Sequence, residues 1–321
     1  MRKFRILFIM SENINIIKES FMFMLKKLFA VIAVLTSAIL LLAGCVKEKQ
    51  VVIISVANTV TAQAIGEIYA QALEAANYRV ERRFSTASNH DKHALHYALR
   101  DGHIDIYVGY TGDETFMLGK EPEANQRSIY DNLKKYFGEE GITLLEPVPA
   151  NGAYTLAVLS ELAAAERIET FTELFEKSNR LKIAITKAFK NGKEGFGILE
   201  KSYGAFSFAE VVIVGENGLY DALDSKKTDV AVVRRNDGLI SDAKYKALRD
   251  DLNAFVPQAI TPITKKLFIE NNPAVSDALN KVSVTLTDDA VIELNRQLTV
   301  LKKDYKKVAK QYLSDAGLLK K

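Results

Sequence analysis

The stretch His103-Ile104-Asp105-Ile106-Tyr107-Val108-Gly109-Tyr110-Thr111-Gly112-Asp113 decides the fold. A turn at Gly102 opens it, and residues 103–108 have the apolar, β-branched character of a buried strand. An aromatic ring, a hydroxyl and a glycine follow that strand. Because open α/β sheets hold their ligands at the C-terminal ends of strands, we expect one wall of a ligand site at Tyr110.

The sequence before this stretch alternates between strand and helix patterns. Residues 51–56 form an apolar, β-branched run, and residues 61–76 have helical periodicity with Asn58-Thr59 as the N-cap. A second strand over 78–82 and a helix over 91–100 complete the series. A β-α-β-α-β order predicts parallel strands joined by right-handed crossovers.

The rest of the chain predicts a second lobe of the same kind. Strands over 144–147 and 154–159 lead into a second β-α-β unit that runs to about residue 255. Helices over 272–283, 287–297 and 303–313 close the chain. We therefore expect an α/β fold with a ligand cleft between two lobes. The expected lobe 1 comprises 51–151 and 257–321, lobe 2 comprises 152–256, and the hinges lie near 150–152 and 255–257.

The N-terminus has the pattern of a secretory signal. Lys26-Lys27 precede sixteen uncharged residues, 28–43, which are too few for a spanning helix of about 20. Leu42-Ala43-Gly44-Cys45 resembles a bacterial lipobox, and Cys45 is the only cysteine. We expect a signal peptide over 1–44, with 1–23 a mis-called extension, and a linker over 45–50 after a lipidated Cys45. A membrane anchor with an incidental cysteine is the alternative. The expected location is the extracytoplasmic face of a cell membrane.

Charge and motifs exclude several functions. Residues 1–44 hold six Lys or Arg and two Asp or Glu of the chain's 43 and 40, which leaves 37 and 38 in the mature part, a net charge of −1. That balance gives no electrostatic reason to expect nucleic-acid binding. No nucleophile elbow, phosphate loop or dinucleotide fingerprint is present. We expect neither an enzyme nor a cofactor.

The histidines form the one cluster that suggests a different function. All four lie within fourteen residues, at His90, His93, His96 and His103. Steps of three residues place two of them near one face of a helix, which metal ligands require. A metal-binding lipoprotein is therefore the alternative function, and an ordinary polar helix surface is the simpler interpretation.

Several motifs resemble the substrate-binding proteins of ABC importers for glycine betaine, choline and carnitine. Ile104-Asp105-Ile106-Tyr107-x-x-Tyr110-Thr111-Gly112 is similar to the family's most specific motif, and Asn151-Gly152-Ala153-Tyr154 and Asn236-Asp237-Gly238 follow it as well. The resemblance covers about 51–318. It implies a type II periplasmic-binding fold that closes on a small solute and docks on a permease driven by its ATPase. It also implies a monomer, with ligand-binding residues Asn58, Tyr110, Thr111, Gly112, Tyr154, Arg234, Asn236 and Gln258.

Two departures from the family pattern concern the ligand. The family holds its ligand in an aromatic cage, in which Tyr110 and Tyr154 match two tyrosines, whereas Arg234 and Gln258 replace two others. An aromatic face attracts a quaternary ammonium group, but an arginine beside it repels the same cation. Arginine instead favours a carboxylate. The sequence thus predicts a retained fold with a changed ligand, either zwitterionic or anionic. The alternative is a solute of the glycine betaine or choline type, with Arg234 turned to solvent while Arg235 or another group shapes the pocket.

Overall fold

The computed structural model describes residues 22, 24, 49–84, 93–121, 123, 125–192 and 194–319. The chain forms two compact units, residues 1–49 and 50–321, and all that follows concerns the second. The predicted lipidation site Cys45, nearly all of the signal peptide, and His90 lie outside the described residues. Within the described residues, no helix is both long and apolar enough to cross a membrane.

The first sheet contains the strand that the opening stretch predicts. Its strands are β1 (Val51–Val56), β2 (Arg79–Arg82), β3 (Ile106–Tyr110), β4 (Ile142–Leu144) and β10 (Ile260–Lys265). Their spatial order is β2-β1-β3-β10-β4, with β1 parallel to β2 and β3, and β10 antiparallel to both of its neighbours. The parallel part matches the predicted β-α-β-α-β order. We call this sheet and its helices lobe 1.

The second sheet repeats the same strand pattern. It contains β5 (Tyr154–Leu159), β6 (Lys182–Thr186), β7 (Glu210–Val214), β8 (Val230–Arg234) and β9 (Tyr245–Ala247), in the order β7-β6-β8-β5-β9. Here β5 is the antiparallel strand, between β8 and β9. We call this sheet and its helices lobe 2. Each lobe thus has one strand that runs against the others, and both antiparallel strands follow a crossing between the lobes.

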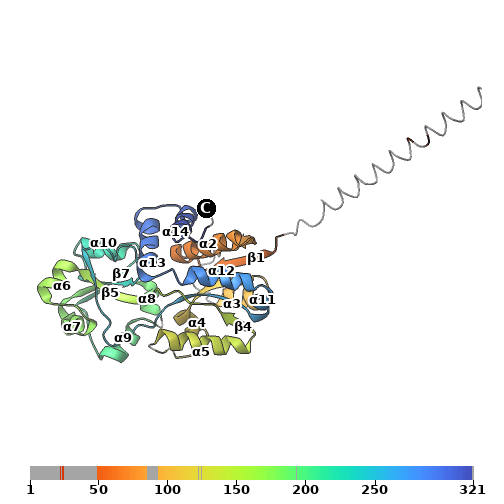
Figure 1. Cartoon of the computed structure of the whole chain (residues 1–321). Coiled ribbons are helices and arrows are strands. Elements are labelled where there is room, and N and C mark those ends of the chain that lie inside the picture. The colour runs from red at the N-terminus through yellow and green to blue at the C-terminus, as the bar shows by residue number, and fades with distance from the viewer. Residues whose placement is uncertain are drawn as a thin grey trace, which may run out of the picture. The chain divides into compact units, whose positions relative to one another are not determined.

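Helices cover both faces of the lobe 1 sheet (Figure 1). Ile106 and Val108 of β3 pack in one buried cluster, whereas Tyr107 between them packs in another, as the alternation of side chains along a strand requires. The first cluster lies under α2 (Val60–Ala75), α12 (Pro273–Ser283), α13 (Asp288–Asn295) and α14 (Tyr305–Asp315). The second lies under α3 (His93–Arg100) and α5 (Gln126–Glu139), with α4 (Thr111–Met117) beside them; α11 (Lys266–Asn271) follows β10.

Lobe 2 is built in the same way. Leu156 and Val158 of β5 face a cluster rich in phenylalanine, and Ala157 faces the opposite side, under α10 (Gly218–Asp224). The remaining elements are α6 (Ser160–Glu166), α7 (Phe171–Phe175), a 3₁₀ turn (Ser178–Arg180), α8 (Lys187–Asn191) and α9 (Phe196–Tyr203). The predicted N-cap is confirmed at Thr59, whose hydroxyl accepts from the backbone N–H three residues later, and Thr170 caps α7 in the same way.

The structure adds a strand that the sequence pattern does not predict. Pro262 lies inside β10, between β3 and β4, and proline normally argues against a central strand. The N and O atoms of one strand residue point to the same side, and the carbonyl of Pro262 accepts from the N–H of Leu145. The missing N–H therefore points beyond Leu144, where β4 has already ended. Proline is tolerated there because no ladder bond needs its donor.

The end of the decisive strand also differs from the prediction. β3 begins and ends later than 103–108, and α4 starts at the next residue, so that Thr111 and Gly112 lie in its first turn. The sequence does not predict a helix here, because α4 has only seven residues and so shows too little apolar periodicity. The consequence is that a helix N-terminus points at the place where the lobes meet.

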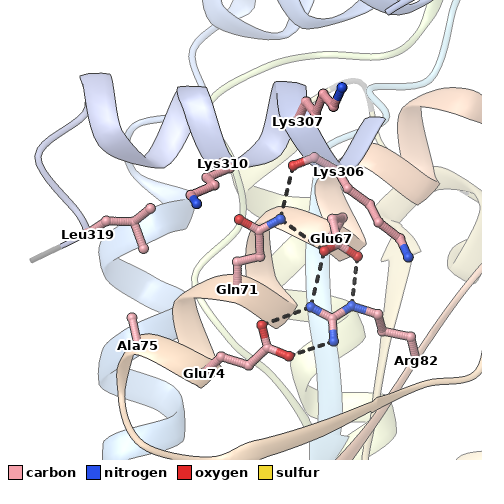
Figure 2. A pocket seen from close by; sticks show the side chains of 9 residues that line it. All are labelled: Glu67, Gln71, Glu74, Ala75, Arg82, Lys306, Lys307, Lys310 and Leu319. Atoms are coloured by element: carbon pink, nitrogen blue, oxygen red, sulfur yellow. Dashed lines mark hydrogen bonds and ion pairs between the residues drawn. The ribbon is translucent and has the colours of Figure 1, made fainter. Parts of the chain in front are cut away.

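A buried ion pair joins α2 to the edge strand β2 (Figure 2). The carboxylate of Glu67 is only 2% exposed, and Nε and Nη2 of Arg82 lie 2.7 and 3.1 Å from its two oxygens. Gln71 donates to the same carboxylate over 2.9 Å. Arg82 also bonds Glu74, and this network floors an open groove of about 520 Å³ beside the lysines of α14.

We expect Arg82→Ala to lower the free energy of unfolding by about 3 kcal/mol, because removing one partner leaves a buried charge. Urea unfolding followed by circular dichroism measures this. Arg127→Ala is the control, since Arg127 pairs with Asp131 on an exposed helix surface and its removal should leave the midpoint unchanged. Equal midpoints for the two variants would contradict the prediction.

Candidate ligand site between the lobes

The two segments that connect the lobes lie side by side. The N–H of Gly152 donates to the carbonyl of Gln258 over 3.0 Å, and Asn151 pairs with Ala259 as an isolated bridge. Oδ1 of Asn151 accepts from the N–H groups of both Ala153 and Gln258, at 2.9 and 3.0 Å. The predicted hinge segment 150–152 is thus hydrogen-bonded to residues 258–259, which directly follow the other predicted hinge segment, 255–257.

Tyr110 ends β3 at this crossing. It is half-buried and packs against the lobe 1 core. A Cβ at Gly152 would lie 3.5 Å from a ring carbon of Tyr110 and 3.2 Å from Nδ2 of Asn236, so the glycine allows residues of both lobes to approach. Burial raises the pKa of Tyr110, while the charge of Arg234 and a hydrogen bond with Thr59 oppose that rise.

Arg234 lies on the face of Tyr154. The two residues are cross-strand partners in β8 and β5, and Cζ of Arg234 is 3.5 Å from the centroid of the Tyr154 ring. Nη1 also donates to the carbonyl of Gly152 over 3.2 Å, and no other hydrogen bond of the guanidinium occurs in the described residues. Phe189 and Phe255 pack against the ring, with centroids 5.2 and 5.8 Å away. Arg234 therefore points into the crossing and not to solvent.

The charges around Tyr154 have mixed signs. Burial is the main reason that the pKa of Tyr154 is raised, and the positive charge of Arg234 opposes it. Glu194, Asp113 and Glu216 raise that pKa further. A site with one guanidinium and several carboxylates near one ring can attract both ends of a zwitterion.

Gln258 is buried and bonded to both lobes. Its side chain is 2% exposed, and Oε1 accepts from the N–H of Asp113 over 3.2 Å at the start of α4. Nε2 donates to Oε1 of Glu194 over 3.1 Å, in the turn before α9. A Cβ at Gly112 would lie 2.6 Å from Nε2, so Gly112 makes room for this amide.

Thr111 braces the backbone behind the site. It has no exposed surface, and its hydroxyl accepts from the N–H of Ala259 over 3.1 Å. Its own N–H donates to the carbonyl of Ala259 over 2.9 Å. Thr111 thus ties β3 to the returning segment, and the structure places it beside the predicted site residues without exposing it to a solute.

Asn58 and Asn236 take different positions. Asn58 is exposed and accepts from Gln63 within the start of α2. Asn236 is 5% exposed, and its carbonyl accepts from Nδ2 of Asn295 over 2.6 Å, which joins lobe 2 to α13. Thr61 donates to Oδ1 of the same Asn295 over 2.7 Å. Asn236 therefore lies beside Tyr110 and Gly152, whereas the only side-chain hydrogen bond of Asn58 in the described residues is the one from Gln63.

Sequence reasoning missed Glu194 and Asn295, which both contribute to this region. Glu194 is 8% exposed and lies in the glycine-rich turn over 192–197, which the sequence analysis did not connect with the site. A carboxylate between two glycines just before a helix was the available signal. Nothing in the sequence near Asn295 indicates its role, because its partners are 59 and 234 residues away.

A buried carboxylate also fills the space beside Gly109. Glu114 accepts from the hydroxyl of Tyr107 over 3.0 Å, in a buried position. A Cβ at Gly109 would lie 2.6 Å from Oε1 of Glu114. Burial and the Glu114 carboxylate raise the pKa of Tyr107 well above its usual value. The acidic group beside Tyr107 and Gly109 of β3 therefore comes from α4.

The described histidines do not form a metal site. His96 is buried, stacks near Phe137 with centroids 5.2 Å apart, and lies 3.2 Å from Oε2 of Glu140. Across the part of the chain with described positions, no group of three or more His, Cys, Asp or Glu could hold a metal ion. The metal-binding alternative therefore has no support.

Comparison with known proteins agrees with this architecture. Residues 50–315 match the model of the substrate binding domain of ABC-type glycine betaine transport systems. The ergothioneine transport permease/ergothioneine binding protein of Helicobacter pylori is 27% identical over 88% of this chain, which spans about half (51%) of that relative. The glycine betaine-binding protein YehZ of Escherichia coli is 25% identical over 70% of this chain and 77% of its own length. These relatives are proteins of solute transport and not enzymes.

Solved structures agree on the fold. A glycine betaine/carnitine/choline ABC transporter structure superposes with a TM-score of 0.76 at 24% identity, covering 84% of this chain and all of that one. The structure of apo YehZ gives 0.69 at 21% identity, over 83% and 99%. Both lobes thus have the type II periplasmic-binding fold. Since the family model spans most of the chain, this protein belongs to the family of substrate-binding domains of ABC-type glycine betaine transport systems.

We expect Gly238→Ala to hold the lobes apart. A Cβ at Gly238, after β8, would lie 2.4 Å from the backbone N of Arg296 and 2.6 Å from its Cα, and backbone atoms cannot move aside as a flexible side chain can. Small-angle scattering of residues 50–321 should show a larger radius of gyration than the parent. Gly215→Ala, which meets nothing within 4 Å, is the matched control. If the variant were as compact as the parent, the close approach of Gly238 to Arg296 would not set the separation of the lobes.

Proposed function

We propose that this chain is the extracytoplasmic solute-binding protein of an ABC importer, and that it captures a small zwitterionic, osmoprotectant-like solute. It delivers the solute to a permease driven by an ATPase, acts as a monomer, and is tethered by a lipid on Cys45. The lobes divide at 151/152 and 256/257, and the solute lies between them. Three observations support this proposal: the match to the family, the hydrogen-bonded segments that connect the lobes, and the charged groups that act on Tyr154.

One observation carries the choice of solute: the guanidinium of Arg234 lies 3.5 Å from the centroid of the Tyr154 ring. A cation of the protein thus occupies the ring face that a quaternary ammonium group would use. A solute without a carboxylate meets like charge there. A solute with a carboxylate gains a charge-assisted hydrogen bond to the arginine.

The nearby carboxylates favour a zwitterion over a simple anion. Glu194, Asp113 and Glu216 each raise the pKa of Tyr154, so an anion at this ring would also meet their negative charge. A solute with an ammonium group and a carboxylate can direct each end to the matching charge. Ligands of this class include glycine betaine and carnitine, whereas choline lacks the carboxylate.

Transport follows from closure of the lobes about the crossing. A solute that contacts both lobes binds the closed arrangement more tightly, and so shifts the equilibrium toward it. The permease then receives the closed form. Tyr110 from lobe 1, and Tyr154, Arg234 and Asn236 from lobe 2, border the solute in this proposal, with Asn58 near the entrance. Thr111 and Gly112 support the site from behind.

Isothermal titration against glycine betaine, carnitine and choline tests the proposal. We expect the unchanged protein to bind a carboxylate-bearing solute and not choline in the micromolar range. Arg234→Gln should weaken binding of that solute about tenfold or more, because it removes a charge-assisted hydrogen bond worth about 1.5–3 kcal/mol. Arg234→Tyr should strengthen choline binding about tenfold, because it adds a ring and removes a like charge.

Arg235→Gln is the matched control. Arg235 is the exposed neighbour of Arg234, so its replacement should leave all three affinities unchanged. Micromolar choline binding by the unchanged protein would contradict the choice of solute. Absence of binding to all three solutes would contradict the osmoprotectant class.

The anchor has its own test. We expect the full chain to fractionate with membranes and to incorporate a labelled fatty acid, and Cys45→Ser to abolish both while leaving solute binding intact. Cys45 is the only cysteine, so labelling has no second site of this kind. Unlabelled, membrane-bound Cys45→Ser protein would instead point to a plain membrane anchor.

A further inference from the structure

Gln258 is held rigidly by its own backbone at the crossing. Its N–H donates to Oδ1 of Asn151, and its carbonyl accepts from the N–H of Gly152, both over 3.0 Å. These bonds fix the Cα of Gln258 between the two connecting segments. Its side chain starts from the place where the two connecting segments meet, and it is 2% exposed.

The amide of Gln258 reaches from this point into both lobes. Toward lobe 1, Oε1 accepts from the N–H of Asp113 in the first turn of α4. Toward lobe 2, Nε2 donates to the carboxylate of Glu194 in the turn before α9. The two distances, 3.2 Å to the N of Asp113 and 3.1 Å to Oε1 of Glu194, are those of ordinary hydrogen bonds.

The neighbours allow only one orientation of this amide. A backbone N–H on one side requires an acceptor, and a carboxylate on the other side requires a donor. Glutamine supplies both, whereas a glutamate at this position would place its carboxylate against that of Glu194, and a tyrosine would offer a single hydroxyl. The bond to Glu194 involves a charged acceptor at a site that is 8% exposed, which makes it stronger than a neutral hydrogen bond.

We propose that Gln258 is a positioning residue that bridges the lobes and holds them closed, through Glu194 in lobe 2 and the N–H of Asp113 in lobe 1. Its polar atoms are already engaged and Nε2 lies against Gly112, so the side chain contacts protein where the family resemblance predicts contact with the ligand. The closing interaction that a caged ligand would supply comes here from the protein itself. The consequence for solute release depends on the proposed function, whereas the bridge does not.

Closure without any solute provides the test. In the Cys45→Ser background, dye pairs on cysteines at the exposed positions Lys134 (α5) and Glu176 (after α7) report lobe separation by single-molecule energy transfer. Gln258→Met keeps the side-chain size but removes both polar ends, and Glu194→Ala removes the acceptor. Each should raise the ratio of open to closed molecules about tenfold, as expected for losing a hydrogen bond to a charged group. Gln311→Ala, on exposed α14, is the matched control.

A swap of the pair separates a bridge from a general structural role. Gln258→Glu alone places the new carboxylate against that of Glu194 and should open the protein further. Gln258→Glu combined with Glu194→Gln recreates one donor and one acceptor, since the new carboxylate can accept from both Asp113 N–H and the new amide. The closed population should return to within about twofold of the parent.

Two results would overturn the bridge: an unchanged open-to-closed ratio in Gln258→Met and Glu194→Ala, or a swapped pair that stays as open as Gln258→Glu. Melting curves identify any single variant that fails to fold, and the swapped pair then decides the question. With a solute from the titrations, stopped-flow release should be about tenfold faster in Gln258→Met than in Gln311→Ala. Failure of every solute to bind would contradict the proposed function and leave the solute-free measurement valid.

Discussion

One side-chain carbonyl, Oδ1 of Asn151, joins the two segments on which the lobes depend. It accepts from Ala153 at the start of the outgoing segment and from Gln258 in the returning one. The N–H of Asn151 in turn donates to Asp288 at the start of α13 over 2.9 Å. These bonds tie both connecting segments to each other and to α13 of lobe 1. Tyr110, Tyr154, Arg234 and Gln258 are all positioned relative to this point.

The same crossing explains why charge, rather than cavity shape, distinguishes the site. Arg234 and Tyr154 are opposite each other in the β8–β5 pairing, so the register of two strands places the guanidinium on the ring. The arginine also bonds the carbonyl of Gly152 in the crossing itself. Its position is therefore coupled to the hinge, and a solute that engages Arg234 acts directly on the segment about which the lobes turn.

Local patterns predict the fold well where the chain is regular. The strands around β1 and β3 follow from apolar runs, and the caps at Thr59 and Thr170 follow from residue chemistry. β10 was not predictable, because Pro262 is acceptable only where β4 has ended, which is a tertiary fact. In the site, the motif around Tyr110 was informative, whereas Glu194 and Asn295 act through partners distant in sequence. The role of Gln258 required knowing what lies on both sides of its amide.

Arg234 and Gln258 stand where the resembling family has tyrosines, and the structure gives the two positions different surroundings. Position 234 ends a strand facing Tyr154, so a long cationic side chain there can only lie along the ring or leave the cleft. Position 258 lies in the crossing, between a helix N-terminus and a carboxylate, so an amide there satisfies both. An aromatic cage combines ligand recognition and closure in the same rings. Here a charged group is available for recognition and a neutral hydrogen-bonding group for closure, which allows the two properties to change independently.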